Sequence, residues 1–243
     1  MTRLNTYFTI IASLIFLAGC STYYNYPQVV SPHAADIPLI KEKGELKVDV
    51  GGSFTGVDAL RNSNEFNTED LRILPSVHGT ISYGMSNRFA LQMHANLSVL
   101  SMYYLQTALG LFNGFGNKSV VELYGGYGYG SSIYGNWMKT NSKYHLPFVQ
   151  FNIGQTGLGA LRFDYGLGIK AGYIYAHILS DSYYYTFLKD RSLLVEPCVF
   201  FRFGGRKVKF SMRANYFWTN CDVKDDYYLF SPFKLSMGAN FIF

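Results

Sequence analysis

The sequence predicts an all-β fold, a ten-stranded antiparallel β-barrel that spans a membrane, and three observations predict it. Apolar and polar residues alternate in stretches of about 10 to 15 residues from Lys41 onward. Aromatic residues make up 18% of the 243 residues and charged residues only 15%, against about a quarter in soluble proteins. Short and long connections alternate between the stretches. In a soluble sandwich the apolar face is packed inside, whereas these apolar faces are long and end in aromatic residues, as lipid-facing strands do.

The composition excludes several other classes of protein. The 21 Tyr and 20 Phe are too many for a disordered chain. The 24 Gly show no three-residue period, which excludes collagen. The 21 Lys and Arg against 16 Asp and Glu give a net charge of +5 that is mild and scattered, so we expect no nucleic-acid partner.

Residues 1–19 have the pattern of a secretory signal peptide. A basic start at Arg3 is followed by an apolar run, 8–18, that is shorter than the ~20 residues of a transmembrane helix. The run ends in Leu-Ala-Gly before Cys20, which resembles the lipobox of bacterial lipoproteins, where the Cys thiol is acylated. We therefore expect lipidation at Cys20; the alternative is an ordinary signal peptide with an incidental cysteine.

Residues 20–42 are expected to form a lipid-anchored extended tether, because 21–40 contains three prolines and no regular period. Residues 43–243 are expected to form the barrel. The ten predicted strands are 45–55, 76–84, 89–99, 104–112, 120–130, 148–154, 161–175, 193–203, 208–216 and 233–243. In each strand the apolar residues face lipid, and the polar residues and many glycines face a small lumen.

The connections between the predicted strands have alternating lengths. Short turns are expected at 85–88, 113–118, 155–160 and 204–207, and long connections at 57–70, 131–147, 176–191 and 218–231. The connection near 100–104 is the exception, because it is short although the alternation predicts a long connection there. Barrels of this kind have short periplasmic turns and longer extracellular loops, so both termini are predicted on the periplasmic side.

The predicted inner faces carry charges of both signs, which should pair and fill the lumen because buried charges need partners. A turn at Gly205-Arg206 would place Cys198 opposite Arg213 and make Glu196 a diagonal neighbour of Arg213. We interpret this pair as a structural salt bridge rather than a catalytic or conducting site. The predicted charge network consists of Glu196, Arg213, Arg202, Lys170, Glu122, Asp164 and Arg162, and further inward charges are Lys47, Asp49, Lys209 and Lys234.

His78 and His94 both face inward if their hairpin has an odd-numbered turn centred on Ser86, which sets them opposite each other. Two facing histidines could bind a metal. No inward Cys, Asp or Glu on the adjacent faces completes a ligand set, so polar packing is favoured and no metal or cofactor is expected. A disulfide between Cys198 and Cys221 is possible in an exported chain, but one lies in a strand and the other in a loop, which favours two free thiols.

Two aromatic-rich loops are candidate binding surfaces. Their residues are Tyr183, Tyr184, Tyr185, Phe187, Tyr227 and Tyr228. Exposed aromatic clusters mark interfaces or sugar platforms. Tyr is also enriched at the level of lipid headgroups, so these residues could either bind a ligand or anchor the barrel in the membrane.

With its signal, alternating strands and terminal Phe243, the chain resembles small outer-membrane β-barrels of Gram-negative bacteria, and its lipoprotein signal is similar to those of lipidated barrels in the Bacteroidota. The resemblance implies outer-membrane lipid as a partner and recognition of the strand ending at Phe243 by the barrel-assembly machinery. Some lipoproteins of that group carry acidic residues after the Cys as a surface-export signal. Here residues 21–24 are Ser-Thr-Tyr-Tyr, so the resemblance implies an anchor in the periplasm-facing leaflet.

We therefore expect a non-catalytic structural barrel, or an accessory subunit bound to another envelope protein. The main alternative is a surface binding protein or adhesin that uses the aromatic loops, followed by a narrow solute channel. Omptin-type proteases are ten-stranded barrels with Asp and His at the outer rim. The nearest counterparts here are His177 with Asp181, and Asp222, Asp225 and Asp226 on another loop, and a protease is the least favoured reading.

Overall fold

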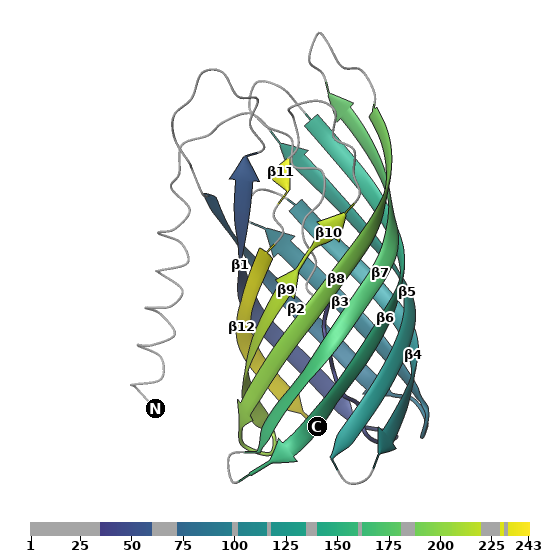
Figure 1. Ribbon diagram of the computed structural model, residues 1–243, viewed down its shortest axis with the longest axis vertical. Coiled ribbons are helices and arrows are strands. Elements are labelled where there is room, and N and C mark those ends of the chain that lie inside the picture. The colour runs from purple at the N-terminus through teal and green to yellow at the C-terminus, as the bar shows by residue number, and fades with distance from the viewer. Residues whose placement is uncertain are drawn as a thin grey trace.

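The computed structural model is a tall barrel of tilted strands (Figure 1). It describes residues 35–59, 72–98, 102–115, 118–134, 140–159, 162–180, 188–219, 229–230 and 233–243. The long strands are β1 (Leu46–Ala59), β2 (Arg72–Gly84), β3 (Phe89–Ser98), β4 (Met102–Phe115), β5 (Ser119–Tyr134), β6 (Thr140–Leu158), β7 (Phe163–Ser180), β8 (Leu188–Gly204), β9 (Val208–Tyr216) and β12 (Phe233–Ile242), and the short ones are β10 (Trp218–Thr219) and β11 (Leu229–Phe230). No helix in this part of the chain is long and apolar enough to cross a membrane.

The ten long strands close into one antiparallel barrel. Consecutive strands from β1 to β9 are hydrogen-bonded neighbours, and β12 lies between β9 and β1. The closing pairs include Val48 with Phe241 on β1 and Met212 with Met237 on β9. The short strands β10 and β11 add pairs to β8 and β1. The predicted ten-stranded antiparallel barrel is therefore confirmed.

The barrel wall is apolar outside and polar inside. Outward-facing Leu109, Leu97 and Leu167 are 57–60% exposed, whereas inward-facing Gln150 and Asn152 are completely buried. On β7 the outward residues from Tyr165 to Tyr175 are apolar or aromatic, and their ten residue steps span roughly 25 Å at the usual rise and tilt, the height of a membrane band. Apolar residues outside and polar residues inside are the reverse of a soluble protein, and they are typical of a transmembrane barrel.

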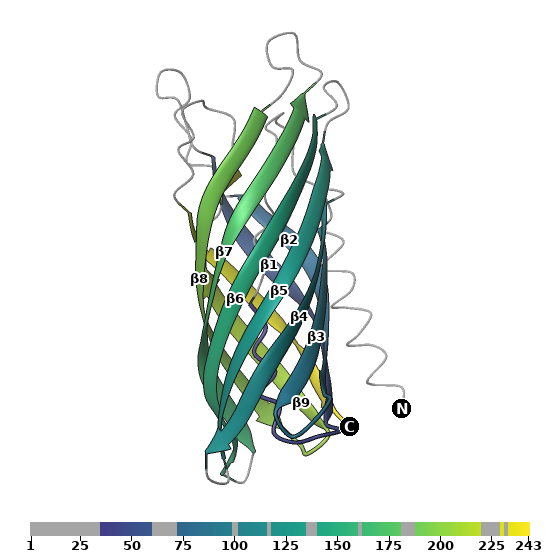
Figure 2. The same cartoon turned by 90° about the vertical axis from the view of Figure 1, so that its right-hand side faces the viewer.

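Seven of the ten long strands are longer than predicted, and β5 to β8 are among them. β5 to β8 contain 16, 19, 18 and 17 residues and reach far toward the end with the long connections (Figure 2). The 148–154 prediction for β6 was too short, because the alternation changes sign before residue 148. There Tyr144 and Leu146 are buried inside the barrel while Lys143 faces outward and is exposed. A strand that leaves the lipid keeps its period of two residues but faces water outside, so its outer side becomes polar.

Two turns set a different register from the prediction. The turn between β2 and β3 is odd-numbered as predicted, but Met85 N donates to Phe89 O over 2.8 Å, which pairs Thr80 with His94 rather than His78 with His94. The turn between β8 and β9 is closed by the bond from Gly205 N to Val208 O, also 2.8 Å. Each strand keeps its inward face, because the pairing moves by two residues.

The second turn overturns the predicted partner of Cys198. Arg206 and Lys207 occupy the turn instead of Gly205 and Arg206, and Cys198 lies opposite Asn215 rather than Arg213. Gly204, which pairs with Lys209 in the last strand pair before the turn, has a positive φ of 149° that glycine adopts readily, and the turn begins one residue later than the Gly-Arg pattern suggested.

Candidate functional site: the occupied lumen

The lumen contains a stretch of the chain that precedes the first strand. Residues 35–40, here called the lumen segment, are the purple trace inside the barrel before β1 (Figure 1). Ala35, Ile37, Leu39 and Ile40 are 0% exposed and Asp36 is 2% exposed. Residues 20–42 were predicted to form an extended tether, and this prediction is wrong for residues 35–40, which are buried in the lumen. Residues 20–34 lie outside the described part of the chain.

The lumen segment runs from the short-turn end of the barrel to its middle. At the short-turn end Gly44 N donates to Gly84 O over 2.7 Å, and Gly84 N donates to Glu45 O over 2.9 Å. At the other end of the segment Ala35 N donates to Glu196 Oε1 over 2.8 Å. Glu196 lies near the middle of β8, so the segment fills the lower half of the lumen.

Wall side chains satisfy the backbone of the lumen segment. Ile40 N donates to Glu122 Oε1 over 2.7 Å, and Arg202 Nη2 donates to Ile37 O over 2.6 Å. Gln92 and Gln150 each donate through Nε2 to Asp36 O, over 3.0 and 2.6 Å.

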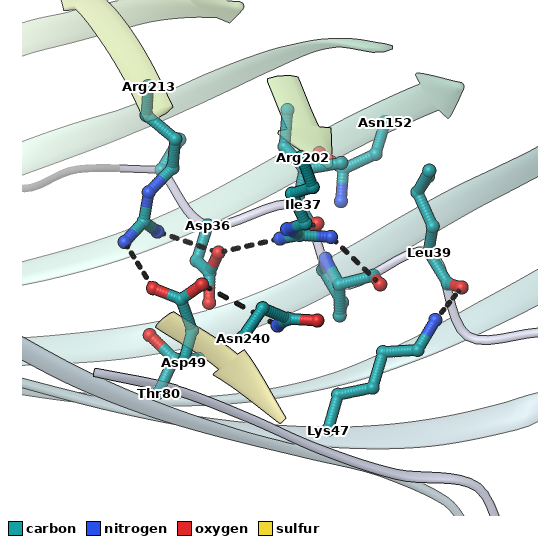
Figure 3. A network of polar contacts seen from close by, with 12 residues as sticks. Asp36, Ile37, Leu39, Lys47, Asp49, Thr80, Asn152, Arg202, Arg213 and Asn240 are labelled. Atoms are coloured by element: carbon teal, nitrogen blue, oxygen red, sulfur yellow. Dashed lines mark hydrogen bonds and ion pairs between the residues drawn. The ribbon is translucent and has the colours of Figure 1, made fainter. Parts of the chain in front are cut away.

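At the short-turn end Lys47 Nζ donates to Leu39 O over 2.5 Å (Figure 3). Buried peptide groups need such partners. The inward polar residues that were expected only to pair with one another therefore also hold a peptide.

Asp36 joins the lumen segment to the charges of the wall. Its Oδ1 lies 2.7 Å from Arg213 Nη1 and 3.6 Å from Arg202 Nη2. Arg213 Nη2 also donates to Asp49 Oδ1 over 2.7 Å and contacts His78 Nε2, and Asn240 Nδ2 donates to Asp49 Oδ2 over 3.5 Å. Figure 3 shows the Asp36 carboxylate between the guanidinium groups of Arg213 and Arg202, with Asp49 below Arg213.

The lumen segment reduces a charge imbalance. Among the described wall residues, the buried cations outnumber the buried carboxylates by six to four. The cations are Lys47, Lys170, Arg202, Lys209, Arg213 and Lys234, and the carboxylates are Asp49, Glu122, Asp164 and Glu196. Asp36 brings a fifth carboxylate into this low-dielectric space, where an unpaired charge is costly.

The predicted salt bridge between Glu196 and Arg213 is wrong. Glu196 Oε2 lies 3.8 Å from Lys170 Nζ, and its Oε1 accepts a hydrogen bond of 2.8 Å from Asn215 Nδ2. The two-residue change in register moves Arg213 away from Glu196. Arg213 pairs instead with Asp36, a residue that the prediction did not include in the network. Asp164 forms a separate pair with Lys209, at 2.6 Å.

Arg162 does not belong to the lumen network. It lies in the turn before β7 with φ of 46° and is partly exposed. The predicted strand 161–175 began two residues too early, and Arg162 therefore lies at the short-turn rim rather than on the inner wall. The other predicted network members, Glu196, Arg213, Arg202, Lys170, Glu122 and Asp164, are buried in the lumen.

Glycines on the inner wall make room for specific large side chains. A Cβ at Gly128 or Gly130 would collide with the rings of Tyr104 and Tyr144, which stack with centroids 6.0 Å apart. A Cβ at Gly168 would meet Ile37 Cδ1 at 2.6 Å, one at Gly154 would meet Leu39 Cδ1 at 2.7 Å, and one at Gly84 would meet Ile40 Cγ2 at 3.1 Å. Inward glycine was predicted from the narrow lumen, but three of these positions accommodate the lumen segment itself.

The two inward histidines are diagonal neighbours. Their rings stack with centroids 6.2 Å apart, and Thr80 Oγ1 lies 2.8 Å from His94 Nδ1. His78 Nε2 lies 3.6 Å from Asp49 Oδ1, so an inward carboxylate does lie beside the pair, contrary to the sequence analysis. Within the described residues no group of three or more His, Cys, Asp or Glu is arranged to hold a metal.

Several candidates lie outside the described residues. These are Cys20, Asp181, Tyr183, Tyr184, Tyr185, Phe187, Cys221, Asp222, Asp225, Asp226, Tyr227 and Tyr228. Of the residues compared with a protease site only His177 is described, and it faces outward on β7. Cys198 is buried and its Sγ donates to Ala35 O over 3.5 Å.

The lumen segment is the feature that sequence reasoning missed, although two signals pointed to it. Residues 35–40 read Ala-Asp-Ile-Pro-Leu-Ile, which is more apolar than a solvated tether requires. The inner faces of the predicted strands also contained more cations than carboxylates, which called for an additional acidic group.

Comparison with known proteins identifies no family for this chain. No protein-family model matches the chain, and no curated protein matches its sequence. Among solved structures 19 chains match. One is an outer membrane channel from Pseudomonas putida F1, which is 11% identical, with 88% of this chain and 100% of that chain covered and a TM-score of 0.48. A likeness of this size does not extend to function.

Proposed function

We propose that this chain is a non-catalytic outer-membrane barrel whose lumen is closed by its own lumen segment, and that it serves as a structural or accessory subunit of an envelope complex. The observation that carries the proposal is the complete burial of residues 35–40 among the wall charges. While the lumen segment is in place, the wall charges that could attract a solute are bonded to it instead.

The strand number supports a closed barrel. Barrels of about 8 strands are filled by side chains, and open aqueous channels appear at about 16. Here ten strands enclose a peptide as well as side chains, and Arg202 and Lys47 are each bonded to carbonyl oxygens of the lumen segment. Little room is left for a continuous water path.

The proposed location and partners follow from both ends of the chain. The outward apolar wall, the signal peptide at 1–19 and the lipobox at Cys20 support insertion into an outer membrane with an N-terminal lipid anchor. Apolar and polar residues alternate along the terminal strand from Phe233 to Phe243, which supports recognition of this strand by the barrel-assembly machinery. The anchor is proposed in the periplasm-facing leaflet.

Conductance and co-purification test the proposal together. The full chain, inserted into planar bilayers, is expected to show no steady conductance. Extraction from native membranes in mild detergent, followed by mass spectrometry, is expected to yield a stoichiometric envelope protein. A steadily conducting wild-type barrel would refute the closed lumen, and a particle that contains one chain alone would refute the accessory role.

A channel opened by withdrawal of the lumen segment is the second candidate. It is favoured by the way the segment is held: residues 35–40 form no strand pair and are bound by side chains. Without Asp36 the described wall keeps six buried cations and four carboxylates, so an opened lumen should prefer anions. Deletion of 35–40 is then expected to produce anion-selective conductance in planar bilayers, whereas a silent deletion variant that is still folded would exclude this candidate.

A further inference from the structure

The outer wall carries a basic patch that the lumen does not involve. Lys143 and His145 of β6, His177 of β7 and Arg191 of β8 face outward, and all but His145 are well exposed. We call these four residues the basic wall patch. Lys143 pairs with His177 across the strands, and Tyr175 lies between His145 and Arg191 in the next register row. Directly paired residues on one face are about 5 Å apart, so the patch is compact.

The basic wall patch lies at the upper limit of the apolar band. On β8 the outward residues from Phe203 to Leu193 are apolar, and Arg191 is the next outward residue. On β7 the outward run ends at Tyr175, and His177 follows.

A row of aromatic rings marks the same level. The ring of Tyr129 lies 5.2 Å from that of His145, and the rings of Tyr173 and Tyr175 are 4.8 Å apart. Tyr side chains of this kind mark the headgroup level of a membrane.

Lys143 and Arg191 have no carboxylate partner within the described wall. The outward-facing described residues of β5 to β8 include no Asp or Glu. Lys143 and Arg191 take part in none of the ion pairs found among the described residues. Two cations are thus displayed toward the headgroups of the surrounding lipid without an ion-pair partner among the described residues.

We propose that the basic wall patch binds the phosphate of a lipid headgroup on the long-connection side of the membrane. Lys and Arg are the usual phosphate-binding side chains, and Arg can do so in bidentate fashion. Tyr175 lies beside Arg191, and Tyr173 lies one step further toward the apolar band, where both can contact the glycerol or sugar region and upper acyl chain of the same lipid. The patch then fixes the depth of the barrel and orders a shell of anionic lipid around β6 to β8.

The test is a lipid titration of the full chain in detergent, read out by native mass spectrometry. The probes are a glycolipid that carries phosphate monoesters, the same glycolipid without its phosphates, phosphatidylglycerol, and inorganic phosphate alone. The test variant is K143A/R191A, and the matched control is R206A/K207A, which removes two exposed cations from a short turn at the opposite end. Heat-shifted gel mobility checks that both variants are folded barrels.

Each cation near a membrane surface contributes about 1 kcal/mol, or about fivefold in affinity. K143A/R191A is therefore expected to weaken binding of the phosphorylated lipid by roughly 30-fold, and R206A/K207A by less than about twofold. If phosphatidylglycerol binds as tightly as the glycolipid, phospholipid is the source of the phosphate; if it binds more weakly, the glycolipid is. Equal losses in the two variants, equal binding of the dephosphorylated glycolipid, or equally tight binding of inorganic phosphate alone would overturn the proposal.

Discussion

The carboxylate of Asp36 lies 2.7 Å from the guanidinium of Arg213, which is 177 residues away in the sequence. Arg213 bonds Asp49 of the barrel wall through its other terminal nitrogen. One arginine thereby ties the lumen segment to strands β1 and β9, next to the place where the barrel closes. Through Arg213 the lumen segment is therefore linked to the two strands that flank β12.

Asp36→Ala is expected to lower the free energy of unfolding by about 3–5 kcal/mol, because it leaves the buried Arg213 and Arg202 short of a carboxylate. Asp36→Asn, which keeps the shape, is expected to cost less. Urea unfolding in lipid vesicles measures both. The control is Lys41→Ala, since the exposed Lys41 takes part in its hydrogen bond to Glu45 only through its backbone nitrogen. An Asp36→Ala barrel as stable as wild type would show that the ion pair does not hold the segment.

Gly168→Val is expected to destabilise the barrel by about 1–3 kcal/mol through overpacking. The new side chain would collide with Ile37 Cδ1 and Asn152 Oδ1, the nearest atoms at 2.6 and 2.8 Å from a Cβ. Gly125→Val is the matched control on the lipid side, because nothing lies within 4 Å of its Cβ. Addition of Ile37→Ala to Gly168→Val should restore part of the loss in the same unfolding measurement. An absence of any restoration would mean that Ile37 does not pack there.

Lys209→Met is expected to cost about 3–5 kcal/mol, because Asp164 is left as a buried charge without its cation. Lys209 Nζ lies 2.6 Å from both Asp164 carboxylate oxygens, and Asp164 Oδ1 also accepts from Gly157 N over 2.7 Å. The double variant Asp164→Asn/Lys209→Met should recover at least half of that loss. A double-mutant cycle by urea unfolding measures the coupling, and additive losses would contradict a direct pair.

The thiol of Cys198 is expected to resist a maleimide in the native barrel, because Cys198 is buried and donates to Ala35 O. Displacement of the lumen segment by Asp36→Ala should speed its modification many-fold. Mass spectrometry of the Cys198 peptide follows the reaction over time. Rapid labelling of the wild-type barrel would indicate that the lumen segment leaves the lumen readily.

The inner and outer faces of the strands followed from the sequence. A period of two residues is a local property of the chain, and the membrane requires each outward position to be apolar. The prediction therefore assigned Glu122, Asp164 and Lys170 to the lumen, where they are found. The prediction missed the part of β6 before residue 148. There the strand is in water, so its outward residues are polar and its inward residues are apolar, although the period of two residues continues.

Register depended on turn geometry that composition does not specify. Gly205-Arg206 was the better turn by residue preference, yet Arg206 and Lys207 occupy the turn, and the glycine with the positive φ is Gly204, which precedes it. A change of two residues keeps every side chain on its face and still replaces every cross-strand partner. The predicted pair of Glu196 and Arg213 was lost for this reason.

The sequence by itself determined the number of strands, their inward and outward faces, and the alternation of short and long connections, because each is written in a local pattern that a membrane enforces. Only the tertiary structure decided what fills the barrel. Residues 35–40 acquire their place from contacts with strands as distant as β8 and β9. Those contacts exist only when the wall has closed around the lumen segment, and no local periodicity records them.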